Sequence, residues 1–172
     1  RRTKIVVRTG IALGSNVGDR WRNLCAARHE VLALPIVGPP EVRSSIYETE
    51  PIDVAEGNAF LNAVIEVEFE AAVVILLEAL QSIEAKLGRP SKRPRNAPRT
   101  IDLDILYVSN LVLTNEEIVI PHPRLHQRRL VLAPLAETRP DLILPGQLKS
   151  VSELLASLQD HSAVRPYGHP WE

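Results

Sequence analysis

The chain has 172 residues, of which 45% are hydrophobic and 24% charged, and its formal net charge at pH 7 is -1. This length suits one domain with a sizeable core, so we expect residues 1–172 to form a single domain. The balanced charge excludes a global attraction to nucleic acid or to membranes, and any anion site must come from local clustering. The lone cysteine, Cys25, excludes an internal disulfide and a multi-cysteine zinc site, and its helical apolar surroundings predict a buried thiol.

The first third of the chain predicts a strand, a helix and a second strand. The first strand covers Thr9–Leu13 and ends at Gly14-Ser15-Asn16. Asp19 then supplies an N-cap signal, and apolar residues at helical spacing follow it. We interpret the run Gly38-Pro39-Pro40 as a break, after which Glu41–Thr49 predicts the second strand.

The middle of the chain holds its clearest strand and its clearest helix. Glu50–Ala59 carries proline, glycine and asparagine and predicts a loop. Over Leu61–Phe69 an apolar set of alternate residues alternates with Asn62, Val64, Glu66 and Glu68, which is typical of a strand with two different faces. Ala71–Leu87 has apolar residues at helical spacing, and Gly88 follows as a C′ stop.

The last part of the chain predicts two further strands and two short helices. Arg89–Pro98 is basic and rich in proline and predicts a loop, whereas Arg99–Val108 predicts a strand. A short strand over Ile118–Ile120 precedes helices over Leu130–Glu137 and Val151–Leu158, the second of which opens with a capping-box pattern. The element order indicates a small antiparallel sheet with helices on one face.

The sequence Asp102-Leu103-Asp104 is the strongest chemical signal. Residues two apart on a strand point to the same side, with Cα atoms about 6.5 Å apart. Ile101, Leu103 and Ile105 then point to the opposite side, toward a core. Two carboxylates on one face repel each other unless a hard cation binds them, and magnesium suits such a site when phosphate supplies further ligands. The alternative is a solvent-facing strand whose acids pair with arginines.

Basic side chains flank the acidic pair in the sequence on both sides. They are Arg89, Lys92, Arg93, Arg95 and Arg99 before it, and His122, Arg124, His126, Arg128 and Arg129 after it. Arginine presents a planar fork that matches phosphate oxygens, so cations around a diacid favour a site for magnesium and polyphosphate. The alternative is a pair of solvated loops. A nucleic-acid surface is disfavoured because aromatic residues are 4% of the chain and do not interleave with the basic runs.

Two further positions are candidates for ligand contacts. Glu84 lies at the edge of the apolar stripe of its helix, where a carboxylate needs a partner such as a nucleotide hydroxyl or an arginine. Phe60 and Asn62 share the strand face opposite the core set, so a ring can stack on a flat heterocycle while an amide binds its edge. The alternatives are a salt-bridged helix carboxylate and a partly buried aromatic at a sheet edge.

Together these segments resemble the 6-hydroxymethyl-7,8-dihydropterin pyrophosphokinases of folate biosynthesis, from Ile11 to about Leu158. The early matching stretches are residues 12–20, 45–49, 60–64 and 88–89. The most specific stretch is Pro98-Arg99-Thr100-Ile101-Asp102-Leu103-Asp104-Ile105-Leu106, followed by Pro121-His122-Pro123-Arg124 and Arg128. The resemblance implies a ferredoxin-like α+β sandwich, mainly an antiparallel sheet with helices packed on its faces, and a cytoplasmic enzyme that transfers diphosphate from ATP to the pterin hydroxymethyl group and releases AMP.

The resemblance also implies roles for individual residues. It implies a catalytic set of Arg89, Arg99, Asp102 and Asp104, in which the two aspartates bind two Mg²⁺ ions. It implies an ATP-binding set of Glu84, Arg89, Arg99, Ile105, His122 and Arg128. It implies a pterin-binding set of Thr49, Phe60, Asn62, Asp102 and Leu130, with Tyr47 only in support. The expected partners are therefore small molecules, without nucleic acid or membrane, for a monomer or weak homodimer.

The sequence departs from the family pattern at four positions. Asn96 stands where a tryptophan is usual, Ser91 where arginine is frequent, Ala97 where glycine is frequent, and Leu130 where an aromatic residue often covers the second pterin face. A pterin- or nucleotide-binding module that has lost catalysis is therefore one alternative. An RNA-binding ferredoxin-like domain is another, but it predicts exposed sheet aromatics and a basic sheet face, which the sequence does not offer.

Overall fold

The computed structural model describes residues 6–49, 59–88 and 100–172. The strands are β1 (Val7–Ser15), β2 (Val37–Arg43), β3 (Tyr47–Thr49), β4 (Phe60–Phe69), β5 (Asp102–Val108), β6 (Leu113–Thr114), β7 (Val119–Ile120) and β8 (Val164–Pro166). The helices are α1 (Arg20–Leu32), α2 (Val73–Lys86), the 3₁₀ turn η1 (Leu125–Gln127), α3 (Arg129–Thr138) and α4 (Val151–Ser157). The predicted loops over 50–59 and 89–98 lie, apart from Ala59, outside the described residues.

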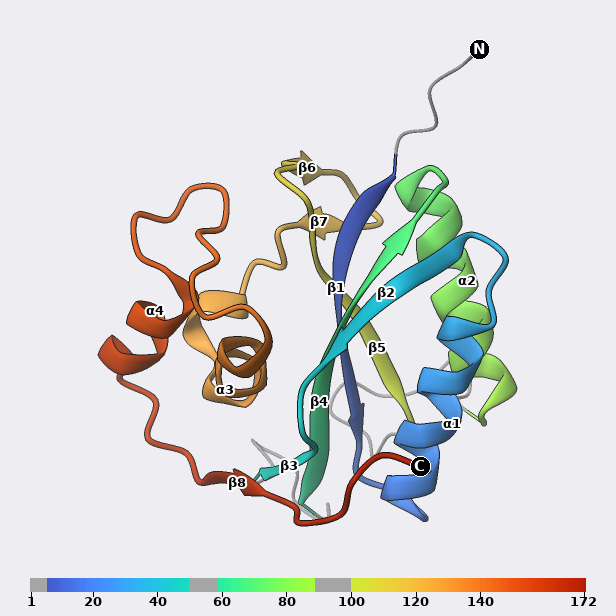
Figure 1. Ribbon diagram of the computed structural model, residues 1–172, viewed down its shortest axis with the longest axis horizontal. Coiled ribbons are helices and arrows are strands. Elements are labelled where there is room, and N and C mark those ends of the chain that lie inside the picture. Colours follow the sequence, from blue (N-terminus) through green and yellow to red (C-terminus); the bar gives the residue numbers. More distant parts are fainter. Residues whose placement is uncertain (1–5, 50–58, 89–99) are drawn as a thin grey trace.

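The larger sheet is antiparallel and has the strand order β5-β1-β4-β3-β8, with β2 also paired to β4 (Figure 1). The chain order from β1 to β5, with α1 and α2 as the two crossovers, is that of a ferredoxin-like fold. The predicted α+β class is therefore confirmed. Strands β6 and β7 form a separate hairpin beside β5.

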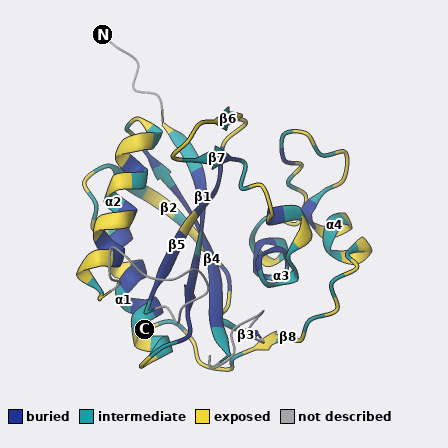
Figure 2. Cartoon of the chain, turned by 180° about the vertical axis from the view of Figure 1, so that it is seen from behind, coloured by how far each residue is buried: buried dark blue, intermediate teal, exposed yellow. Residues whose placement is uncertain are grey.

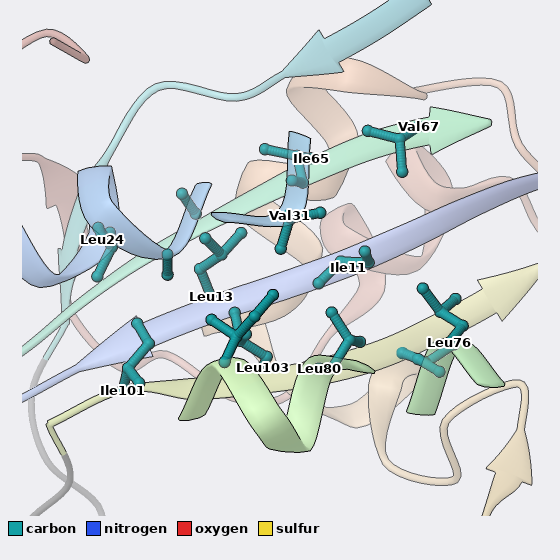
Figure 3. Packing of buried hydrophobic residues seen from close by; sticks show 14 of the residues in the cluster. Ile11, Leu13, Leu24, Val31, Ile65, Val67, Leu76, Leu80, Ile101 and Leu103 are labelled. Atoms are coloured by element: carbon teal, nitrogen blue, oxygen red, sulfur yellow. The ribbon is translucent and has the colours of Figure 1, made fainter. Parts of the chain in front are cut away.

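One face of the sheet is closed by α1 and α2. Figure 3 shows side chains of β1, β4 and β5 directed toward both helices in a continuous apolar cluster. Ile11, Leu13, Leu24, Ile65 and Leu80 are all fully or almost fully buried there. The helix α1 begins where predicted, since the Asp19 side chain accepts a hydrogen bond from the Arg22 amide at 3.1 Å. Cys25 is buried, as its sequence context predicts.

The opposite face carries a second, smaller apolar cluster under α3 and α4. Val64 of β4 and Leu106 of β5 pack there with Leu132 and Leu135 of α3. The expectation from element order that helices cover one face is therefore wrong, whereas the family resemblance implied helices on both. The apolar stripe of a helix indicates that one side of it packs, but not which face of the sheet it covers.

The predicted strand over 41–49 is in fact two strands, β2 and β3. The chain turns at Ser44, whose hydroxyl accepts a hydrogen bond from the Val64 amide at 3.0 Å and replaces a ladder contact. The break predicted at Gly38-Pro39-Pro40 is also wrong, because these residues lie inside β2. The pairing with β4 shifts register between Gly38 and Val42, so the prolines sit where no amide is needed.

Three short elements were not predicted from the sequence: the strands β6 and β8 and the 3₁₀ turn η1. Strand β8 pairs with the outer edge of β3, and its residues Val164–Pro166 are mostly exposed. Two- and three-residue strands have no measurable alternation, so they are recognised only from their partners. In the described part of the chain, no helix has the length and hydrophobicity needed to span a membrane.

Candidate active site

Three neighbouring strands bring Asn62, Gly14 and Asp102 into one row across the sheet. Gly14 of β1 is in register with Asn62 of β4 on one side and with Asp102 of β5 on the other. Directly paired residues in an antiparallel sheet have their side chains on the same face, and strands lie about 4.8 Å apart. The amide and the carboxylate therefore face the same space, with a residue that has no side chain between them.

Gly14 keeps the middle of this row open. A Cβ atom added to Gly14 would lie 3.2 Å from Oδ1 of Asn62 and 3.8 Å from Cδ1 of Phe60. These contacts place the Phe60 ring and the Asn62 amide on the same face as predicted, opposite the core residues Leu61 and Ala63. An aromatic ring, an amide and a carboxylate therefore lie on one sheet face around Gly14.

Thr49 fixes the orientation of the Asn62 amide. Nδ2 of Asn62 donates a hydrogen bond to Oγ1 of Thr49 at 2.7 Å, and both side chains are buried. Because Thr49 of β3 is paired in register with Phe60 of β4, the two strands present these three side chains together. A buried amide with one donor already paired is held in a single orientation and can read a polar edge.

Asp102 and Asp104 share the sheet face of this row. Their neighbours Ile101, Leu103 and Ile105 are buried in the apolar cluster on the opposite face, as the strand alternation predicted. Asp102 is nearly buried at 9% exposure, whereas Asp104 is exposed. The described residues contain no group of three or more histidine, cysteine or acidic side chains arranged for a metal. Two carboxylates alone suit magnesium, which keeps water and phosphate oxygens among its ligands.

Glu84 of α2 contacts the edge of the sheet. Its Oε2 atom accepts a hydrogen bond from the backbone amide of Leu103 at 2.9 Å, and the Glu84 side chain is buried. Strand β5 is the sheet edge on this side, so its outward amide needs an acceptor. The Leu103 amide is therefore one partner of this buried carboxylate.

A cavity of about 370 Å³ lies between α2, β5 and the hairpin of β6 and β7. Its lining includes Leu77, Glu84, Asp104, Ile105, Ile118 and His122. The hairpin tip is held by Asn115, whose Oδ1 accepts hydrogen bonds from the amides of Glu117 and Ile118 at 2.8 and 2.9 Å. The predicted ATP-binding residues Glu84, Ile105 and His122 thus line one cavity that reaches Asp104.

The surroundings of His122 at this cavity favour its neutral form. Its backbone amide donates to the Leu106 carbonyl at 2.8 Å, and its Nδ1 atom accepts a hydrogen bond from the Arg124 amide at 3.2 Å. Burial lowers the pKa of His122 below its ordinary value of 6.5, and the charges of Arg128 and Arg124 lower it further. At neutral pH the ring is therefore neutral, with its proton on Nε2 available to donate.

Of the remaining predicted site residues, Arg128 and Leu130 lie on or next to α3, and the other two are not among the described residues. Arg89 and Arg99 lie outside the described residues. Arg128 is half-buried at the junction of η1 and α3. Leu130 is half-buried in the first turn of α3 and packs against the second apolar cluster.

Sequence reasoning missed two features of the site. It considered Gly14 only as part of the end of the first strand, yet the structure places Gly14 between Asn62 and Asp102. It also missed the acidic hairpin tip at Glu116 and Glu117 that lines the cavity. The signal that could have indicated the role of Gly14 was a glycine within an otherwise apolar strand, because such a glycine often marks the close approach of another group.

The comparisons with known proteins concern the family and the fold of this chain. The model of the 7,8-dihydro-6-hydroxymethylpterin-pyrophosphokinase family matches residues 10–140. A 2-amino-4-hydroxy-6-hydroxymethyldihydropteridine pyrophosphokinase from Bacillus subtilis is 42% identical over 130 residues, which is 74% of this chain and 75% of the relative. One of the same name from Methylorubrum extorquens is 39% identical over 160 residues, 93% of this chain and 99% of the relative.

A solved structure supports the fold. Plasmodium falciparum HPPK-DHPS with pterin and p-hydroxybenzoate superposes with a TM-score of 0.68 at 14% identity. The alignment covers 90% of this chain but 42% of that longer protein, so the similarity concerns the arrangement of elements in one part of it. From the family model and the two bacterial relatives, the chain belongs to the 7,8-dihydro-6-hydroxymethylpterin-pyrophosphokinase family.

Proposed function

We propose that this chain transfers diphosphate from ATP to the hydroxymethyl group of 6-hydroxymethyl-7,8-dihydropterin, releasing AMP, in folate biosynthesis. Family membership supports the reaction. The observation that carries the proposal is the row of Asn62, Gly14 and Asp102 across one sheet face. It offers an amide to read a polar heterocycle and, about two strand spacings away, a carboxylate beside the position of the reacting group.

The pterin occupies the Asn62 side of the row in this proposal. Phe60 stacks on the flat ring, the oriented Asn62 amide binds its polar edge, and Thr49 holds that amide in place. Gly14 allows the ring to approach the backbone of β1. Asp102 is the nearest acid to the hydroxymethyl group, and Leu130 is proposed as an apolar contact on the second ring face.

Asp102 and Asp104 are proposed to hold two Mg²⁺ ions. The fit rests on the donor set, because both carboxylates lie on one strand face and magnesium accepts few protein ligands when phosphate is present. When bound, the ions neutralise charge on the ATP phosphates. The protein's own contribution is to keep both carboxylates at one end of a buried strand, so their spacing is set by backbone geometry.

The nucleotide occupies the cavity beside β5 in this proposal. Ile105 and Leu77 offer apolar contacts to a base, and Glu84 lies at the nucleoside end. Neutral His122 donates from Nε2 to a phosphate oxygen, and Arg128 contributes charge from the same side. Arg89 and Arg99 complete the set proposed from the sequence.

The reaction is an in-line displacement at the β-phosphorus of ATP. The pterin hydroxymethyl oxygen forms the new bond to phosphorus, and the bond from phosphorus to the oxygen of the α-phosphate breaks, so AMP leaves with that electron pair. The hydroxyl proton passes to a carboxylate, for which Asp102 is the nearest candidate. Positioning and electrostatic stabilisation supply most of the rate enhancement in such transfers.

The test replaces each acid by its amide and measures AMP release with ATP, Mg²⁺ and the pterin. Asp102→Asn and Asp104→Asn are expected to lower kcat by at least about a hundredfold, because each removes a charged ligand at the reacting phosphates. Asp141→Asn, an exposed acid far along the chain, is the matched control and should leave kcat unchanged. Near-normal turnover of both active-site variants would contradict the proposal. Binding of both substrates by the wild type without AMP release would instead support a module that has lost catalysis.

The proposal also covers the type of substrate, the cellular location and the oligomeric state. Small-molecule substrates alone, a cytoplasmic location and a monomer or weak homodimer are proposed from the family resemblance. Light scattering across a range of protein concentrations measures the assembly directly. A stable higher oligomer at low concentration would contradict the last of these.

A further inference from the structure

Arg20 joins the two strands that form the pterin side of the site, from the face opposite to the ligand. It is the first residue of α1, directly after the N-cap Asp19. Its Nη2 atom lies 2.9 Å from Oε2 of Glu48 on β3, and its Nη1 atom donates to the Ala59 carbonyl at 2.5 Å. One guanidinium therefore contacts both β3 and the residue that directly precedes β4.

The two residues that Arg20 contacts directly precede, in the sequence, two of the residues proposed to line the pterin site. Glu48 is followed by Thr49, and Ala59 by Phe60, and Thr49 and Phe60 are paired in register. Side chains alternate along a strand, so Glu48 points away from Thr49 and toward α1. The bonds from Arg20 therefore fix the backbone beneath Thr49 and Phe60 without occupying the space on the ligand side.

Strand β3 needs such support because it contains only three residues. A strand this short has few ladder hydrogen bonds of its own, and its outer neighbour β8 is equally short. The side chains of Arg20 and its partner Glu48 are only 21% and 32% exposed. The Arg20 guanidinium carbon also lies 5.8 Å from the centroid of the Tyr167 ring. A planar fork with two acceptors and an aromatic neighbour loses little freedom when it binds.

We propose that Arg20 is a positioning residue for pterin binding, which acts by holding Thr49 and Phe60 at the spacing that orients Asn62. This inference rests on the proposed assignment of those three residues to the pterin. It assigns a role to the arginine of the Gly18-Asp19-Arg20 stretch, which the proposed chemistry does not use. The cavity proposed for ATP lies beside β5, toward the opposite edge of the sheet from β3, and Arg20 is not among the residues that line it.

The chain supplies a matched control in Arg28. This residue lies on the same helix and binds Glu41 through two hydrogen bonds of 2.7 Å, so it also joins α1 to a strand through an arginine–glutamate pair. Its strand is β2, which carries none of the proposed ligand residues. Loss of either arginine reduces stability, but only the loss of Arg20 should alter pterin binding.

The experiment compares Arg20→Gln with Arg28→Gln by steady-state kinetics in both substrates and by urea unfolding. Arg20→Gln is expected to raise the KM for the pterin about tenfold, as for the loss of a charged hydrogen-bonded contact, with the KM for ATP unchanged. Arg28→Gln is expected to lower the unfolding midpoint with both KM values unchanged. Equal effects of the two variants on the pterin KM, or an Arg20→Gln effect on ATP instead, would overturn the inference.

Two further variants keep the test decisive. Glu48→Gln removes the ion pair but leaves the bond to Ala59, so its effect on the pterin KM should be smaller and non-additive with Arg20→Gln. If Arg20→Gln does not fold, a normal pterin KM for Glu48→Gln would overturn the inference.

The variant Asn62→Ala separates the role of Arg20 from the proposed pterin assignment. A normal pterin KM for Asn62→Ala would refute the ligand assignment itself, whereas a raised KM with normal Arg20→Gln kinetics would refute only the role of Arg20.

Discussion

The two faces of the central sheet are built from the same strands but differ in role: one forms the apolar core, and the other carries the polar row of the candidate site. The face toward α1 and α2 is a closed apolar cluster, in which Ile11, Leu13 and Leu80 are buried. Figure 2 shows buried residues along the strands and on the sides of both helices that face the sheet. The face toward α3 is divided, with apolar packing around Val64 and a polar row that includes Asn62. Stability and chemistry are therefore carried by alternating residues of one backbone, one position apart.

The second face also holds a buried carboxylate, on the side of Val64 away from Asn62. Glu66 of β4 is buried there and accepts a hydrogen bond from the Tyr107 hydroxyl at 2.7 Å, while Arg8 and Arg139 lie at 2.8 and 3.3 Å from its carboxylate oxygens. A buried carboxylate is tolerated because every side of it is paired. Gly10 makes room for the Tyr107 ring, since a Cβ atom would lie 2.3 Å from it.

The largest expected effect comes from emptying the closed face. Leu80→Ala removes a fully buried side chain of α2 and is expected to reduce the free energy of unfolding by about 2–5 kcal/mol. The KM values for ATP and pterin should remain those of the wild type at temperatures where the variant is folded. Urea unfolding and steady-state kinetics measure the two. A raised KM with unchanged stability would show that the faces are not separable.

A smaller effect is expected from filling the polar row. Gly14→Ala places a methyl group 3.2 Å from Oδ1 of Asn62, in the space proposed for the pterin. The KM for the pterin should rise about tenfold, which corresponds to about 1.4 kcal/mol of binding free energy, with a change in stability below about 1 kcal/mol. Gly38→Ala is the matched control, because a Cβ atom there meets nothing within 4 Å. Equal kinetics of the two variants would contradict an open floor at Gly14.

The smallest effect concerns pH and His122. The folded protein lowers the pKa of His122 below 6.5, chiefly by burial, so the unfolded chain binds this proton at higher pH than the folded chain does. Stability therefore falls as pH drops below about 6.5, by less than about 1.4 kcal/mol per pH unit from this one group. Urea unfolding between pH 7.5 and 5.5 should show a shallower decline for His122→Gln than for the wild type. Parallel profiles would mean that burial does not act on this ring.

Much of the fold follows from local patterns. Alternation over Leu61–Phe69 is confirmed by β4, and the predicted helix over Ala71–Leu87 by α2, with Gly88 at a φ of +100° after its end. The capping-box pattern before α4 is confirmed by hydrogen bonds in both directions between Ser150 and Glu153. These features depend on residues a few positions apart, so a single sequence contains the information for them.

The second strand and the second layer could not be predicted in the same way. The division at Ser44 depends on a hydroxyl that bonds to Val64, twenty residues later, and prolines inside β2 depend on a register shift against β4. Glu84 was recognised as a buried carboxylate that needs a partner, and one partner is the Leu103 amide of a strand at the sheet edge. Each of these outcomes is set by which strand lies next to which.

The sequence by itself determined that Asp102 and Asp104 share one face while Leu103 and Ile105 share the other, because strand alternation follows from backbone geometry alone. It also determined the family, through motifs whose order and spacing are specific. Only the tertiary structure decided that Asn62 and Asp102 stand on either side of Gly14. Register between distant strands is chosen by the burial of whole side-chain sets, and that energy belongs to the assembled sheet and not to any one segment.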